Sequence, residues 1–140
     1  MGTLDISDLP DGALLLVDAA PIIYMFEEKP LAARFRPIFE AHASGAIRFA
    51  ISAITISEVL TGPLQNSDES LARRYRSVLE SWQVVALDAD IAETAARLRA
   101  TLRLKLADAI QAASALAVNA SALLTHDRDF SRLRAVRVIS

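Results

Sequence analysis

Five carboxylates in this sequence each lie where an apolar run ends or where a helical pattern begins. They are Asp18, Glu58, Asp108, Asp127 and Asp129. Two carboxylates ~5 Å apart repel by roughly 3 kcal/mol at an effective dielectric of ~20, so a group of them either holds protons at a raised pKa or shares a cation. Oxygen-only ligands in a chain without cysteine favour Mg²⁺ or Mn²⁺. Such a cage suits phosphodiester cleavage, because one ion lowers the pKa of an attacking water and a second stabilises the leaving oxygen.

The elements that must hold these carboxylates alternate between short apolar runs and longer Ala-, Leu- and Arg-rich stretches with helical spacing. The predicted strands cover residues 13–17, 47–51, 84–87, 122–125 and 136–139. The predicted helices cover residues 21–28, 31–43, 55–60, 68–81, 90–102 and 106–119. This alternation predicts an α/β fold with a mainly parallel sheet and right-handed crossovers.

Two local signals set helix ends in this prediction. Asp90 and Glu93 have the spacing of a capping box, which predicts that a helix begins there. Gly62 followed by Pro63 predicts that the helix over residues 55–60 ends before them.

A parallel sheet brings the five carboxylates toward one edge, because all strands end there and crossover helices begin there. Asp18 directly follows one predicted strand, and Asp127 and Asp129 come shortly after another. Glu58 lies about one turn into a helix, and Asp108 lies in the first turn of another. For Asp108 to lie at this edge, the helix over residues 90–102 must lie across or outside the sheet. Thr125 is expected to give polar support at a strand end nearby.

Length and composition set limits on the class of protein. The chain has 140 residues, 53% hydrophobic and 23% charged, which predicts one domain over residues 1–140. The absence of cysteine excludes disulfides and thiolate zinc sites, and nothing indicates secretion, so we expect a cytoplasmic protein. The apolar runs fall far short of the ~20 residues that span a bilayer, so no membrane partner is expected.

Four segments, read in order, resemble the motifs of PIN-domain ribonucleases. They are residues 16–24, 51–60, 106–113 and 123–130, and order and spacing match from about residue 14 to residue 139. The small size most resembles the VapC toxins of bacterial and archaeal toxin–antitoxin modules. The resemblance implies a three-layer α/β/α sandwich, a divalent-metal-dependent endoribonuclease that hydrolyses RNA, a homodimer and a cognate antitoxin.

By motif position, the resemblance implies that Asp18, Glu58 and Asp108 are catalytic metal ligands and that Asp127 completes the set. Asp129 fits the fourth position nearly as well. Many relatives carry Thr, Ser or Asn just after the first Asp, where this chain has Ala19 and Ala20, so a hydrogen bond to the water shell of the metal is missing.

Each feature also has a plainer interpretation. Asp18 could cap a helix, and Asp127 and Asp129 could be ordinary turn residues. Strand alternation points His126 away from Asp127, which makes it a rim residue rather than a general base. The apolar stretch 22–26 fits an association surface or a core helix.

The sequence is also compatible with two other functions. One is a cleavage-incompetent PIN module that binds RNA or a protein partner. The other is a receiver-like phosphoacceptor domain, which would need a second acid just before Asp18, where Leu16 and Val17 stand instead.

Arginines are more informative here than the formal net charge of −2. Arginine suits bidentate phosphate contacts, and the predicted contacts to the RNA backbone are Arg73, Arg74, Arg128 and Arg132. Solvated helix faces would explain the same residues without RNA. One or two bound divalent ions would bring the net charge to about neutral or slightly positive, which is compatible with an RNA substrate.

Overall fold

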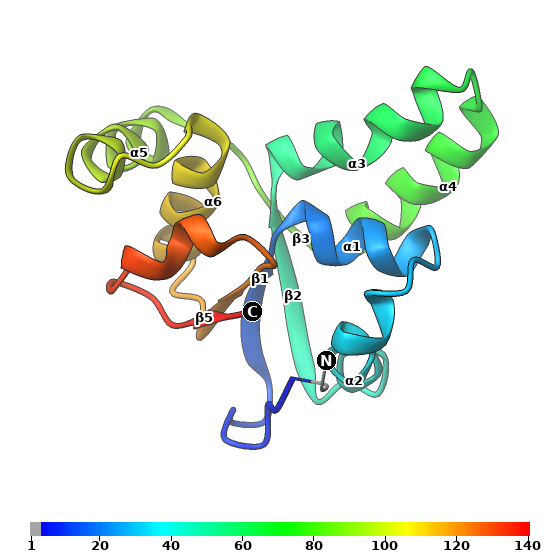
Figure 1. Ribbon diagram of the computed structural model, residues 1–140, viewed down its shortest axis with the longest axis horizontal. Helices are drawn as coiled ribbons and strands as arrows, with labels where there is room; N and C mark the ends of the chain where they lie inside the picture. The colour runs from blue at the N-terminus through cyan, green and yellow to red at the C-terminus, as the bar shows by residue number, and fades with distance from the viewer. Residues whose placement is uncertain (1–3) are drawn as a thin grey trace.

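Five parallel strands form one sheet in the order β3-β2-β1-β4-β5 (Figure 1). The computed structural model describes residues 4–140, so the first three residues of the predicted domain lie outside the described residues. The strands are β1 (Ala13–Val17), β2 (Ile47–Ser52), β3 (Gln83–Val85), β4 (Ala122–Leu124) and β5 (Val138–Ile139). The α/β fold class predicted from the sequence is confirmed.

Helices cover both faces of this sheet. They are α1 (Ala19–Phe26), α2 (Ala32–Ala43), α3 (Ala53–Gln65), α4 (Glu69–Glu80), α5 (Ala89–Leu102) and α6 (Leu106–Ala117), with a 3₁₀-helix, η1, at Arg128–Arg132. Residues of α1 to α4 share one apolar cluster on one face of the sheet, and residues of α5 and α6 share a second cluster on the other face. Figure 1 shows the resulting three layers, with α1 to α4 to the right of the sheet and α5 and α6 to its left.

Strand β1 is an unbroken apolar run because it lies at the centre of the sheet and is buried on both faces. Leu15 and Val17 belong to the cluster under α1 to α4, whereas Leu14 and Leu16 belong to the cluster under α5 and α6. This two-residue alternation is the ordinary geometry of a strand.

Helix α6 is the one that packs on the sheet, and α5 lies on its outer side (Figure 1). This is the arrangement that the position of Asp108 requires, since α6 then leads directly into β4.

Several predicted element ends are wrong. Helix α3 continues through Gly62 and Pro63 to Gln65, because Pro63 lies close to the helix end, is buried, and removes only one N–H donor. The cap of α5 is Asp88, whose carboxylate accepts the N–H of Ile91 at 2.9 Å, and not Asp90. The edge strands β3 and β5 are shorter than the predicted runs 84–87 and 136–139.

The apolar stretch 22–26 contributes Ile22 to the core, and its remaining residues are partly exposed. Ile22 is fully buried, and Ile23, Tyr24 and Phe26 pack against the same cluster. No helix within residues 4–140 has the length and apolar character needed to cross a membrane.

Candidate metal centre

The site lies at the point where the strand order reverses. From β1 the chain moves to β2 and β3 on one side, and it later returns to β4 and β5 on the other side. Ligands of open α/β sheets bind at the carboxyl ends of the strands at such a point. Asp18 follows β1 and Thr125 follows β4, and the Thr125 hydroxyl donates to Asp18 Oδ2 at 2.7 Å.

Asp18 is held from two sides. It caps α1 by accepting the N–H of Ala19 at 2.8 Å, so the plain interpretation as a helix cap holds alongside its place in the site. The side chain is nearly buried, at 8% exposed. Burial raises the pKa of Asp18, and the hydrogen bonds from Thr125 and Ala19 oppose that rise.

Gln111 lies between Asp18 and Glu58 and contacts both. It was not predicted as a site residue from the sequence. Its Nε2 donates to Thr55 Oγ1 at 2.7 Å and to Asp18 Oδ1 at 3.2 Å, and it lies 3.5 Å from a carboxylate oxygen of Glu58. Gln111 is 1% exposed, and its Oε1 has no hydrogen-bond partner within the described residues. A signal existed: Gln111 lies one helical turn after Asp108, on the same face of a helix that is otherwise apolar there.

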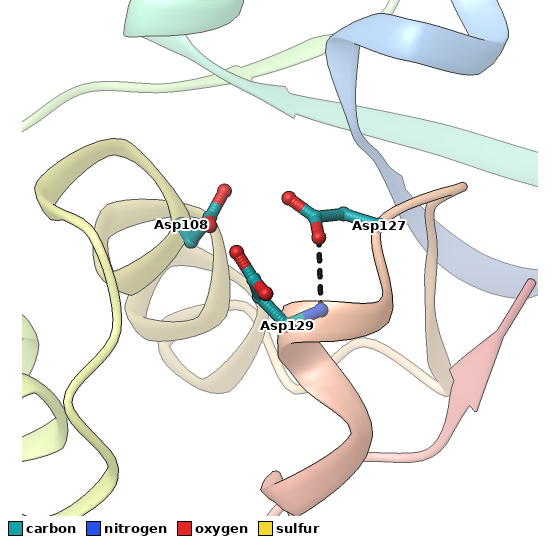
Figure 2. Close-up of side chains that lie close together, drawn as sticks. All are labelled: Asp108, Asp127 and Asp129. Carbon is teal, nitrogen blue, oxygen red and sulfur yellow. Dashed lines mark hydrogen bonds between the residues drawn. The ribbon is translucent and has the colours of Figure 1, made fainter.

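Three aspartates form the densest group of acids (Figure 2). Asp108, Asp127 and Asp129 each place a carboxylate oxygen within 4.8 Å of the others. Asp127 accepts the N–H of Asp129 at 2.8 Å, which caps η1, and its own N–H donates to Thr125 Oγ1 at 2.9 Å. The turn-forming role of Asp127 therefore coexists with its place in the group.

The negative charges of the three-aspartate group repel one another. Burial, and then the negative charges of Asp127, Asp18 and Asp129, raise the pKa of Asp108 to about 6, while Lys105 lowers it. Asp108 Oδ2 is buried without a partner in residues 4–140. Burial and the charge of Asp18 also raise the pKa of Glu58, although its side chain reaches the surface.

One hollow contains most of the predicted ligands. A space of about 660 Å³ is lined by Asp18, Ala19, Ala20, Tyr24, Glu58, Asp108, His126, Asp127 and Arg128. A water occupies ~30 Å³ in the liquid, so this space has room for ions, their water and a phosphate group. Asp129 is not part of the lining, whereas Asp127 belongs both to the hollow and to the three-aspartate group.

His126 faces this hollow, contrary to the prediction from strand alternation. Its Nδ1 is 2.9 Å from the Tyr24 hydroxyl, and its ring lies edge-on to Tyr24 and Phe35. Strand β4 ends at Leu124, so the two-residue alternation does not extend to residues 126 and 127.

The predicted arginine contacts separate into two groups. Arg128 lines the acidic hollow, and Arg132 lies four residues further along η1. Arg73 and Arg74 are exposed on α4 and do not line the hollow. The contact of all four with RNA stays a prediction.

The donor set fits a hard divalent cation. Asp18, Glu58, Asp108 and Asp127 offer only carboxylate oxygens, and one of these oxygens is buried without a partner. A cation at this point would relieve the repulsion that raises the pKa of Asp108.

Metal affinity should therefore depend on pH. Because the pKa of Asp108 is about 6, binding of Mn²⁺ must displace a proton below that pH, and affinity should fall by about tenfold per pH unit there. Calorimetric titration of the metal-free protein with Mn²⁺ across this range is the measurement. An affinity that stays constant through pH 6 would contradict the assignment of Asp108 as a ligand.

Comparison with known proteins places this geometry in context. A family model described as PIN domain matches residues 15–136. A toxin–antitoxin complex from Klebsiella pneumoniae is 28% identical with a TM-score of 0.72, over 90% of this chain and 96% of that one. No curated protein matches the chain significantly.

Two more distant structures share the fold alone. VapBC2 from Rickettsia felis, bound to a DNA fragment from its promoter, is 17% identical with a TM-score of 0.70, over 89% of this chain and 96% of that one. VapC20 from Mycobacterium tuberculosis, described as a toxin that cleaves the Sarcin–Ricin loop, is 18% identical with a TM-score of 0.69, over 90% of this chain and 99% of that one.

Proposed function

Because the chain belongs to the PIN-domain family, we propose that it is a divalent-metal-dependent endoribonuclease that hydrolyses RNA phosphodiester bonds. The family resemblance predicted from the four motifs is confirmed by the match over residues 15–136. The observation that carries the proposal is the convergence of Asp18, Glu58, Asp108 and Asp127 on one hollow at the switch point of the sheet.

In this proposal Asp18, Glu58, Asp108 and Asp127 hold Mg²⁺ or Mn²⁺, and Asp129 supports the site from the three-aspartate group. The bound ions would supply Lewis-acid stabilisation of the phosphate and a water of lowered pKa. Thr125, Ala19 and Gln111 fix the two oxygens of Asp18 by hydrogen bonds of 2.7 to 3.2 Å. Such contacts orient a ligand before the substrate arrives.

The remaining lining residues suit a phosphate substrate. Arg128 brings a guanidinium to the edge of the acidic hollow, where it can bind a non-bridging phosphate oxygen. Ala19 and Ala20 line the hollow with side chains that carry only methyl groups, where the family resemblance implies a hydroxyl or amide in many relatives. The polar groups on that side come instead from Tyr24 and His126.

We further propose that the chain acts as one nuclease domain and as the toxin of a toxin–antitoxin module, in the cytoplasm, as a homodimer restrained by an antitoxin protein. The support is the likeness to the Klebsiella pneumoniae toxin–antitoxin complex at 28% identity. The choice of RNA as substrate is supported by the likeness to a toxin described as cleaving the Sarcin–Ricin loop, which extends to the fold alone.

Metal removal tests the activity. We expect the purified protein to cut a labelled single-stranded RNA internally with Mg²⁺ or Mn²⁺, to lose this activity in EDTA, and to regain it when Mn²⁺ is added in excess. Asp18→Asn, purified in parallel, is expected to be inactive because Asp18 lies at the centre of the site. Any cleavage by this preparation would therefore come from contaminating nucleases. Undiminished cleavage in EDTA would contradict the proposal, and metal binding without cleavage of any RNA would favour a binding module.

A further inference from the structure

A second, basic hollow lies beside the acidic one and shares Arg128 with it. This space of about 200 Å³ is lined by the cationic side chains of Arg103, Lys105, Arg128 and Arg132, and by one carboxylate, Asp129. The two hollows meet at Arg128, which lines both. A ligand with regularly spaced negative charges could therefore occupy both at once.

One wall of the basic hollow is the tight connection between α5 and α6. Arg103 ends α5 in the left-handed region at φ 56°, and Leu104 after it is buried at 5% exposed. The carbonyl of Leu104 accepts a hydrogen bond from Arg99 Nε at 3.3 Å. This anchor fixes the backbone from which Arg103 and Lys105 project.

The opposite wall is η1, which carries Arg128 and Arg132. Asp127 caps this short helix, and the fully buried Phe130 anchors it in the core. Lys105 Nζ approaches Asp129 Oδ2 at 3.9 Å and so links the two walls. The residue that caps one wall of the basic hollow is thus also a predicted metal ligand of the acidic one.

The arginines of this hollow have no protein partner among the described residues, unlike several other arginines of the chain. Within residues 4–140, no hydrogen bond or ion pair involves the side chains of Arg103, Arg128 and Arg132. Elsewhere Arg76 pairs with Glu80, and Arg97 pairs with Glu93. Guanidinium groups bind phosphate oxygens in a bidentate manner, and their excess over the single carboxylate favours an anion.

We propose that the basic hollow binds a phosphodiester group of single-stranded RNA next to the one held at the carboxylates. The RNA backbone then runs from the acidic hollow, past Arg128, to Arg103 and Arg132. This inference rests on the proposed endoribonuclease function and specifies the path of its substrate. The predicted RNA contacts Arg128 and Arg132 lie on this path. Arg73 and Arg74, on α4, do not.

The test separates binding from cleavage. Affinity for a short fluorescein-labelled single-stranded RNA is measured by anisotropy in an Asp108→Asn background, with and without the double change R103Q/R132Q. Because the hollow holds one phosphodiester group, loss of its neutralisation should reduce the slope of log affinity against log salt by about 0.7 and lower affinity by about fourfold near physiological salt. In the cleaving protein the same change should raise KM by a similar factor and change kcat much less.

The matched control is the double change R36Q/R97Q on α2 and α5, which removes two exposed arginines outside both hollows and should leave affinity and salt slope unchanged. An unchanged slope in R103Q/R132Q overturns the proposal, as does an equal loss in R36Q/R97Q, which would indicate only general attraction. A hollow that serves an acidic protein segment instead would also give an unchanged RNA slope. If the protein cuts no RNA but the slope falls as expected, the nuclease function fails and the RNA-binding hollow stands.

Discussion

Replacing Asp108 by asparagine is expected to abolish metal-dependent RNA cleavage and, at the same time, to stabilise the metal-free protein. Asp108 lies in both the acidic hollow and the three-aspartate group, so its loss removes a predicted ligand and one of the charges proposed to hold the cation. A loss of ~4 kcal/mol in transition-state stabilisation corresponds to roughly a thousandfold fall in kcat/KM.

The gain in stability follows from the raised pKa of Asp108. A carboxyl group whose pKa rises from 3.8 to about 6 on folding favours the folded state below pH 4, and this contribution is lost as pH rises to 6. The full shift corresponds to at most ~3 kcal/mol, and partial solvent screening reduces the expected gain of Asp108→Asn at pH 7 to about 1–2 kcal/mol.

Urea denaturation in EDTA measures this gain, and a metal-dependent RNA cleavage assay measures the loss. The matched control is Asp90→Asn, because Asp90 is also an acid in the first turn of a helix but is exposed and outside the hollow. It should lose ~0.3–1 kcal/mol through the helix dipole and keep its activity. Destabilisation of the metal-free protein by Asp108→Asn, or retained cleavage, would contradict the assignment.

Replacing Gln111 by leucine is expected to reduce activity by about 10–100-fold, with a smaller effect on stability. The Gln111 amide positions Asp18 and Glu58 but need not touch the substrate, and loss of such a support commonly costs this much in metal affinity or activity. Two effects on stability oppose each other. An apolar side chain of similar size removes the buried Gln111 Oε1, which has no partner within residues 4–140, but it also removes the Nε2 donor from buried Thr55 Oγ1 and Asp18 Oδ1, so we expect a net loss of about 1–3 kcal/mol.

Gln111→Glu should act differently, because it buries a further carboxylate beside Asp18. Repulsion of ~3 kcal/mol or more between neighbouring carboxylates predicts clear destabilisation of the metal-free protein and partial recovery when Mn²⁺ is added. Thermal unfolding with and without Mn²⁺, together with Mn²⁺ affinity, distinguishes this positioning role from a purely structural one.

Ser114→Ala provides the matched control on the same helix, since Ser114 is as buried as Gln111 but, within residues 4–140, its side chain makes no hydrogen bond to Asp18 or Glu58. It should change neither Mn²⁺ affinity nor activity. A Gln111→Leu protein with normal Mn²⁺ affinity and activity would refute the positioning role.

Much of the fold could be predicted because it depends on local patterns. The run Ala13–Val17 is short and apolar at every position, which is typical of a strand buried on both faces. Parallel strands must share one carboxyl edge, so placing Asp18 and Asp127 after strands was enough to bring them together. The helix end expected at Gly62 was wrong because burial of Pro63 outweighed its local preference.

The sequence by itself therefore determined the fold class, the family and the convergence of the acids at one edge, since each follows from spacing along the chain and the fixed geometry of strands and helices. Only the tertiary structure decided which side chains touch. The contact of Gln111 with Asp18 spans 93 positions, and that of Tyr24 with His126 spans 102. The junction of the two hollows at Arg128 likewise depends on packing. Such contacts depend on how closely α6 and η1 pack against the sheet, and that distance is set by the whole core rather than by any local pattern.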